Sequence, residues 1–133
     1  MAQTSYPYKG VGGSCKYSST NTGVKTTGSV SVSSNNATAM KSALAGRPLS
    51  VLIEADKSVF QNYKSGIFNS SACGTNLDHA VILVGWGTSG GTDYWTVRNS
   101  WGTTWGEKGY IRMAITSGAG VCGVQSQPLY PTV

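Results

Sequence analysis

Hydrophobic residues along the chain fall into short runs separated by turn-forming residues, a pattern typical of a β-rich protein. Four of these runs predict strands: 49–55 (LSVLIEA), 79–87 (HAVILVGWG), 94–101 (YWTVRNSW) and 109–115 (GYIRMAI). The stretch 88–93 (TSGGTD) predicts a turn, so the second and third runs should pair antiparallel. The run at 79–87 is too apolar for a strand with one solvent face, so we expect it to be a central strand.

One segment, 35–48 (NNATAMKSALAGRP), has the signals of a short helix. Asn35 or Asn36 is suited to cap its start, Gly46 to close it in a left-handed conformation, and Pro48 prevents it from continuing. Its apolar residues recur at i, i+3 and i+7 and form one narrow face: Ala37, Met40 and Leu44.

The remaining segments are less regular. Residues 58–68 (SVFQNYKSGIF) predict a helical turn carrying Phe60 and Tyr63, followed by a short strand at Ile67 and Phe68. Residues 1–35 predict a surface loop with one short strand within 24–32, and 121–131 (VCGVQSQPLYP) follows a glycine loop. Together the elements predict one domain over residues 1–133, a mainly β and mostly antiparallel fold with one helix near its edge.

Composition changes this picture only slightly. At 133 residues the chain fits one domain, and 18 glycines with only 11% charged residues favour turn-rich β structure. The net charge of +5 comes from scattered Lys and Arg residues, so we expect no nucleic-acid partner. The apolar runs are too short for a membrane span, and no signal peptide precedes the domain. Met1 is interpreted as an initiator methionine that opens either a mature sequence or an expressed piece, so secretion can be argued only indirectly. The triplets that begin at Asn36 and Asn69 match the glycosylation acceptor pattern, which is consistent with a secretory route.

The candidate chemistry centres on His79, the sole histidine, and on Asn99, twenty residues later. If the strands that carry them pair around their turn, both side chains lie at the same end of the ladder. The Asn99 amide oxygen would then accept a hydrogen bond from one ring nitrogen and aim the other outward, as a general base requires. The alternative is a purely structural histidine. One His and three scattered Cys make no metal-ligand set, so we expect no metal and no cofactor.

Several motifs resemble those of papain-like cysteine proteases of the cathepsin L type, in the order found in the C-terminal half of that family. They are 73–87 (CGTNLDHAVILVGWG), 94–113 (YWTVRNSWGTTWGEKGYIRM) and 120–131 (GVCGVQSQPLYP), supported upstream by SYPYKG, CKY, RPLSVLIEA and FQNYKSGIF. The resemblance spans essentially the whole chain and implies the right-hand, antiparallel β-barrel-like domain of that family, with one or two short helices.

The resemblance also implies roles for individual residues. His79 matches the catalytic base, Asn99 the residue that orients it, Trp101 the ring that covers this pair, and Trp105 the aromatic on the leaving-group side. Four residues match the wall and floor of the main specificity pocket: Leu52, Leu77, Ala80 and Gln127. Asp78 matches a charged neighbour of the base that tunes the site.

The cysteines depart from the family pattern. By their number alone, two could pair and one would be left over, and Cys73 lies only six residues before His79, so distance does not exclude it as a nucleophile. The resemblance instead makes Cys73 and Cys122 a structural disulfide and leaves Cys15 without its usual partner. No cysteine stands in the motif that carries the family's nucleophile at the start of a long helix.

The sequence therefore resembles part of an enzyme, with the helical N-terminal half absent. The resemblance implies hydrolysis of peptide bonds, with the base and much of the pocket on this chain and the attacking sulfur elsewhere. We expect the chain alone to be inactive, and we expect it to bind peptide or protein substrates, the missing half, and itself through the exposed interface. We also expect a lysosomal, vacuolar or secreted location and no membrane partner. The alternative is a non-catalytic binding or scaffold module derived from the same fold.

Overall fold

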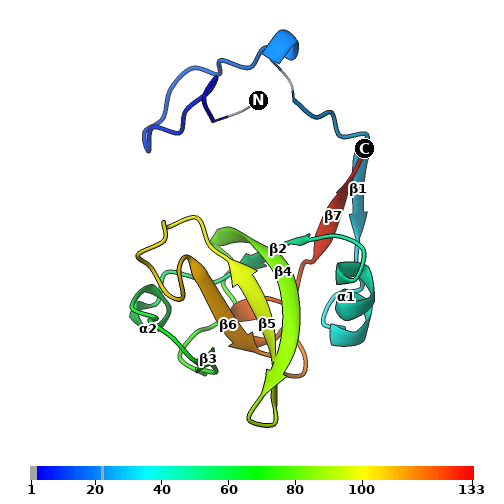
Figure 1. Ribbon diagram of the computed structural model, residues 1–133, viewed down its shortest axis with the longest axis vertical. Coiled ribbons are helices and arrows are strands. Elements are labelled where there is room, and N and C mark those ends of the chain that lie inside the picture. The colour runs from blue at the N-terminus through cyan, green and yellow to red at the C-terminus, as the bar shows by residue number, and fades with distance from the viewer. Residues whose placement is uncertain (1–2, 22) are drawn as a thin grey trace. The chain divides into compact units, whose positions relative to one another are not determined.

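The computed structural model describes residues 3–21 and 23–133 (Figure 1). Two compact units are distinguished. One comprises the N-terminal residues up to Ser29 with Pro131–Val133, and the other is Val30–Tyr130, which contains both α-helices and the candidate site. The described N-terminal residues are almost all exposed, and a single 3-10 turn is found there at Ser19–Asn21. The single domain over 1–133 stays a prediction, and Met1 lies outside the described residues.

The described residues form seven strands that belong to one sheet in the order β1-β7-β2-β4-β5-β6-β3. Their bounds are β1 (Gly28–Ser31), β2 (Leu49–Ile53), β3 (Ile67–Phe68), β4 (His79–Ser89), β5 (Thr92–Arg98), β6 (Tyr110–Ala114) and β7 (Leu129–Thr132). The predicted mainly β class is confirmed. The sheet is not closed into a barrel, because β1 and the two-residue β3 stand at its opposite ends. Most registers are antiparallel, and β3 pairs parallel with β6.

The hairpin of β4 and β5 forms as the sequence predicts, and Figure 1 shows the two strands side by side. Ser89 pairs with Thr92, so the turn consists of Gly90 and Gly91, whose φ angles are 57° and 77°. Glycine populates this left-handed region without the penalty that a Cβ atom imposes, which explains the two glycines at the turn. Tight pairing around the turn brings the start of β4 near the end of β5.

The expectation for the two faces of β4 is wrong. The strand is central, between β2 and β5, but its residues alternate between buried and exposed. Val81 and Leu83 point into the core, whereas Ile82, Val84 and Trp86 are 41%, 38% and 50% exposed. A central position satisfies the hydrogen bonds at both edges of a strand, but it does not cover both of its faces. Apolar composition therefore predicted the pairing and not the burial.

The first helix, α1 (Ala37–Leu44), lies within the predicted segment. The side-chain oxygen of Asn36 accepts a hydrogen bond from the backbone N–H of Ala39, so Asn36 is the N-cap. Met40 is buried, and Ala37 and Leu44 pack against the core, which confirms the predicted apolar face. The expectation for Gly46 is wrong, because its φ is not positive. Instead the chain leaves the helix through right-handed Ala45, and the N–H of Gly46 donates to the carbonyl of Ala43.

The second helix, α2 (Ser58–Gln61), is the predicted helical turn. It buries Phe60 in the same core that β2, β4, β5 and β6 line from the sheet. The largest fully buried apolar side chains of this core are Trp95, Phe60, Met40, Leu49, Ile53, Leu83, Ile111 and Met113. The candidate site lies at the end of this packed sheet, where β4 begins and β5 ends.

Candidate active site

His79 and Asn99 are brought together by the register of three strands. His79 opens β4 and pairs with Ile53 of β2, while Asn99 directly follows β5. The ring Nε2 atom of His79 lies 2.9 Å from the side-chain Oδ1 atom of Asn99, so the predicted hydrogen bond is present. The backbone of Asn99 is fixed as well, because its N–H donates to the carbonyl of Gly109 at 2.9 Å.

The neighbours of Asn99 determine which nitrogen of His79 carries the proton. Oδ1 of Asn99 also accepts the backbone N–H of Ser100 at 2.7 Å, so the oxygen and not the amide nitrogen must face both groups. The Nε2 atom of His79 is therefore the donor, and Nδ1 is left as the acceptor of the neutral ring. Asn99 is only 7% exposed, and its Nδ2 atom has no hydrogen-bond partner among the described residues.

An aromatic cluster covers this pair. The indole of Trp101 stacks on the His79 ring with centroids 5.1 Å apart and planes 28° apart. Trp105 meets Trp101 edge to face at 5.4 Å, and Phe60 of α2 contacts both tryptophans. The Nε1 atom of Trp105 donates to the carbonyl of Gln61, which ties the cluster to α2. An apolar cover strengthens the His79 hydrogen bond because it limits competition from water.

The residues predicted to form the specificity pocket are only partly brought together. Leu52 and Ala80 are direct cross-strand partners of β2 and β4. Leu77 packs against Gly123, and Gln127 is exposed. Asp78 is exposed, but its carboxylate accepts the backbone N–H of Ala55 at 2.8 Å. A shallow hollow of about 210 Å³ borders Ala80 and Asn99.

The cysteines divide as the resemblance implies. Cys73 and Cys122 form a disulfide whose Cα atoms are 4.9 Å apart, which confirms the predicted pairing, and Cys15 is free and exposed in a loop. A cysteine in a disulfide has no thiolate, so neither Cys73 nor Cys122 is a nucleophile in this state. Within the part of the chain that the structure describes, no group of three or more His, Cys, Asp or Glu side chains is placed to hold a metal ion.

Known proteins match the sequence of this chain over nearly its full length. The family described as papain family cysteine protease matches residues 1–132. The chain belongs to that family. It is 51% identical over 129 residues to cysteine proteinase RD21A of Arabidopsis thaliana, covering 95% of this chain and 28% of that protein. It is 45% identical over 134 residues to cathepsin L of Sarcophaga peregrina, covering 98% of this chain and 38% of that protein.

Solved structures of papain-family proteases show the same fold. The bromelain protease of Ananas comosus in complex with the E64 inhibitor superimposes with a TM-score of 0.89 at 44% identity, over 99% of this chain and 62% of that one. Digestive procathepsin L 3 of Tenebrio molitor gives a TM-score of 0.92 at 32% identity, over 100% of this chain and 44% of that one. The chain spans 28% of the length of cysteine proteinase RD21A and 38% of the length of cathepsin L, the two curated relatives named above.

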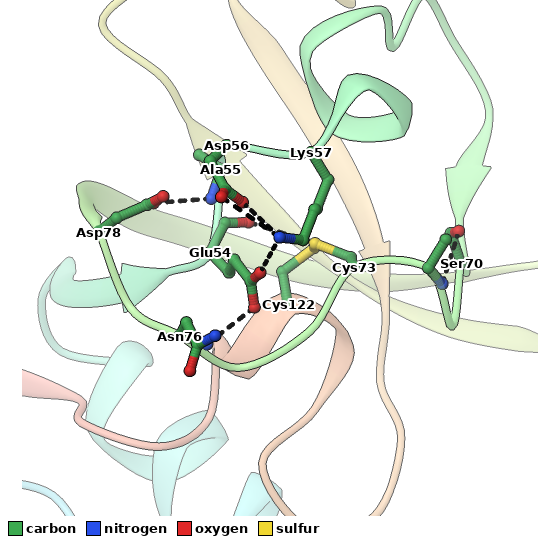
Figure 2. The surroundings of a disulfide bond; sticks show 10 residues. Glu54, Ala55, Asp56, Lys57, Ser70, Cys73, Asn76, Asp78 and Cys122 are labelled. Atoms are coloured by element: carbon green, nitrogen blue, oxygen red, sulfur yellow. Dashed lines mark hydrogen bonds and ion pairs between the residues drawn. A yellow bond between two sulfur atoms is a disulfide. The ribbon is translucent and has the colours of Figure 1, made fainter.

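Sequence reasoning missed one residue beside the site. Glu54 follows β2, is 1% exposed, and lies next to the disulfide, as Figure 2 shows. Lys57 and the backbone N–H of Asn76 both bond to its carboxylate and hold its pKa below the ordinary value, against the effect of burial. The signal in the sequence was an acidic residue at the end of an apolar strand, in LSVLIEA. The alternation of the strand by itself predicts that this side chain is exposed to solvent.

Among residues 3–21 and 23–133, no helix combines the length and apolar character needed to cross a lipid bilayer.

Proposed function

We propose that this chain supplies the general base of a papain-family cysteine endopeptidase. The observation that carries the proposal is the hydrogen bond from His79 to Asn99 beneath the Trp101 ring, because it leaves Nδ1 as the free acceptor. The nucleophile is a cysteine thiol on a part of the protease outside this chain, since Cys73 and Cys122 are joined in a disulfide and the free Cys15 lies in an exposed loop, not at the start of a helix. The chain alone is then inactive.

The proton steps follow from this geometry. Nδ1 of His79 takes the proton of the incoming thiol, and the thiolate attacks the carbonyl carbon of the peptide bond. When the tetrahedral intermediate collapses, the imidazolium returns the proton to the leaving amine, and a thioester remains. The imidazole then takes a proton from water as the water attacks the thioester. When the carbon–sulfur bond breaks, the acid product leaves and the imidazolium returns that proton to the departing thiolate, which regenerates the thiol. Asn99 holds the ring throughout, and Trp101 limits the access of water to the hydrogen bond between His79 and Asn99.

The side chains that would select the substrate on this chain are those of the proposed specificity pocket. Leu52 and Ala80 form a cross-strand pair near the base, and Leu77 and Gln127 complete the proposed pocket. These side chains favour peptides with an apolar residue near the cleaved bond.

Disulfide bonds persist in oxidising compartments, so the Cys73–Cys122 bond supports a lysosomal, vacuolar or secreted location.

The test uses a fusion of this chain to the nucleophile-bearing half of a family relative. We expect thiol-dependent peptidase activity from the fusion and none from the chain alone. His79→Ala in the fusion should abolish turnover, and Asn99→Ala should lower kcat. The matched control is Asn69→Ala, at an exposed asparagine. A fusion that folds but stays inactive, while the chain still binds peptides, would favour the alternative binding module.

A further inference from the structure

The Glu54 carboxylate has two bonds, and they lead to two different segments beside the candidate site. One carboxylate oxygen accepts the backbone N–H of Asn76 at 2.7 Å, and the other lies 2.9 Å from the Lys57 Nζ atom. Lys57 also contacts Asp56 at 3.2 Å, so the ammonium group is shared between two carboxylates. Figure 2 shows Glu54 between these partners and beside the Cys73–Cys122 disulfide. A carboxylate this deeply buried is stable only because it is both paired and hydrogen-bonded.

The first bond fixes the segment that leads into β4. Asn76 lies between Cys73, anchored by the disulfide, and His79. The same segment is tied again at Asp78, whose N–H donates to the carbonyl of Ile53 at 3.0 Å and whose carboxylate accepts the N–H of Ala55. The packing is close as well, since a Cβ atom on Gly74 would lie 2.5 Å from the Glu54 carboxylate.

The second bond fixes the segment that opens α2. Lys57 is the N-cap residue of that helix, and its ammonium group pairs with the carboxylates of Glu54 and Asp56. Three residues later, Phe60 packs against Trp101 at 5.6 Å, and Trp101 stacks on the His79 ring. The two bonds of Glu54 thus act on His79 through two routes, the segment that leads into β4 and the aromatic side chains that stack on the ring.

We propose that Glu54 is a positioning residue for His79, because its buried carboxylate joins the segment before His79 to the segment that opens α2 and so fixes the imidazole relative to Trp101. The structural part of this inference stands by itself, and its catalytic consequence rests on the proposed function. A charged carboxylate is required because it alone accepts from both the Asn76 N–H and the Lys57 ammonium. The amide of glutamine would offer one acceptor and turn a donor toward the other partner.

The decisive variant is Glu54→Gln in the full chain. The matched control is Asp93→Asn, which also removes a carboxylate bonded to a lysine, here Lys41 at 2.8 Å, at the far end of the β4–β5 hairpin. The carbon-bound ring protons of His79 report position, because the stacked Trp101 indole shifts their NMR signals upfield. We expect Glu54→Gln to lose this shift and to speed hydrogen exchange at the Asn76 amide about tenfold or more, while Asp93→Asn keeps both.

Two further results decide the inference if the first variant fails. Should Glu54→Gln not fold, Lys57→Gln takes its place, because that side chain is 42% exposed and its loss removes the ion pairs with Glu54 and Asp56 but spares the bond from Asn76 to Glu54. A folded variant of either kind whose His79 signals match the parent chain overturns the inference, even if its stability falls. In the active fusion, Glu54→Gln should lower kcat and leave KM unchanged. A fusion inactive with Glu54 intact would refute the proposed function and leave the NMR result standing.

Discussion

Replacing Cys73 and Cys122 together by alanine should lower the free energy of unfolding of the chain by about 4 kcal/mol. The two residues are 49 positions apart. In the chain-entropy model, a cross-link of that span removes roughly 4 kcal/mol of conformational freedom from the unfolded chain at 25 °C. Both cysteines are buried, at 7% and 1% exposure, so the lost sulfur contacts add to this figure. Alanine keeps the Cβ atom and buries no new polar group.

The backbone at this site does not complicate the comparison. Cys122 has a positive φ of 54°, which strains any residue that has a Cβ atom. Alanine and cysteine carry that strain equally, so it cancels between parent and variant. The difference in unfolding free energy therefore reports the cross-link and its packing.

Urea unfolding followed by tryptophan fluorescence measures the effect, since Trp95 is fully buried. The matched control is Cys15→Ala, at the exposed free cysteine, which should stay within about 0.5 kcal/mol of the parent chain. A reducing agent should destabilise the parent and leave the double variant unchanged. If the double variant unfolds within about 1 kcal/mol of the parent, the entropic account of this disulfide is wrong.

Three further predictions follow from single contacts. Asn99→Ala removes the oxygen that fixes the ring tautomer, so side-chain ¹⁵N NMR should show both neutral tautomers of His79 where the parent shows Nε2–H alone. Pairing with an arginine holds the pKa of Glu107 below its ordinary 4.5, so its stabilisation is complete above pH 4.5 and lost as pH falls through the lowered value. Acid titration of the unfolding free energy should therefore be shallower in Glu107→Gln than in the parent. Gly90 and Gly106 have φ of +57° and +56°, but a Cβ atom meets open space at Gly90 and a backbone oxygen at 2.6 Å at Gly106. Alanine should cost about 1 kcal/mol at Gly90 and about 3 kcal/mol or more at Gly106, as thermal melts would show.

The features that depend on local sequence could be predicted. The TSGGTD turn set the β4–β5 hairpin, because two adjacent glycines suit a tight two-residue turn. That hairpin in turn placed His79 and Asn99 at one end of the ladder, where their hydrogen bond forms. Asn36 capped α1 for an equally local reason, since its side chain reaches an N–H three residues ahead.

The features that depend on distant neighbours could not be predicted. Alternation in β4 is hidden by apolar residues on both faces, so the exposure of Trp86 had no local signal. Gly46 was expected to be left-handed from its residue type, whereas α1 ends at Leu44 through right-handed Ala45 and the φ of Gly46 is not positive. The burial of Glu54 depends on its bond to Asn76, twenty-two residues away. Whether the sheet closes into a barrel depends on whether the strands at its two ends pair with each other.

The arrangement around His79 separates what this chain fixes from what a partner would add. The ring is oriented by Asn99, covered by Trp101 and supported through β2, and all of these contacts lie within Val30–Tyr130. None of them needs a thiol, because the bond uses Nε2 and leaves Nδ1 open. Proton transfer is fastest when the base is held in place before the reacting group arrives, since no ordering cost then remains. If a cysteine from another part of the protease meets Nδ1, its sulfur atom approaches a base that is already in place, because the Glu54 bonds and the disulfide restrict the segment that carries the imidazole.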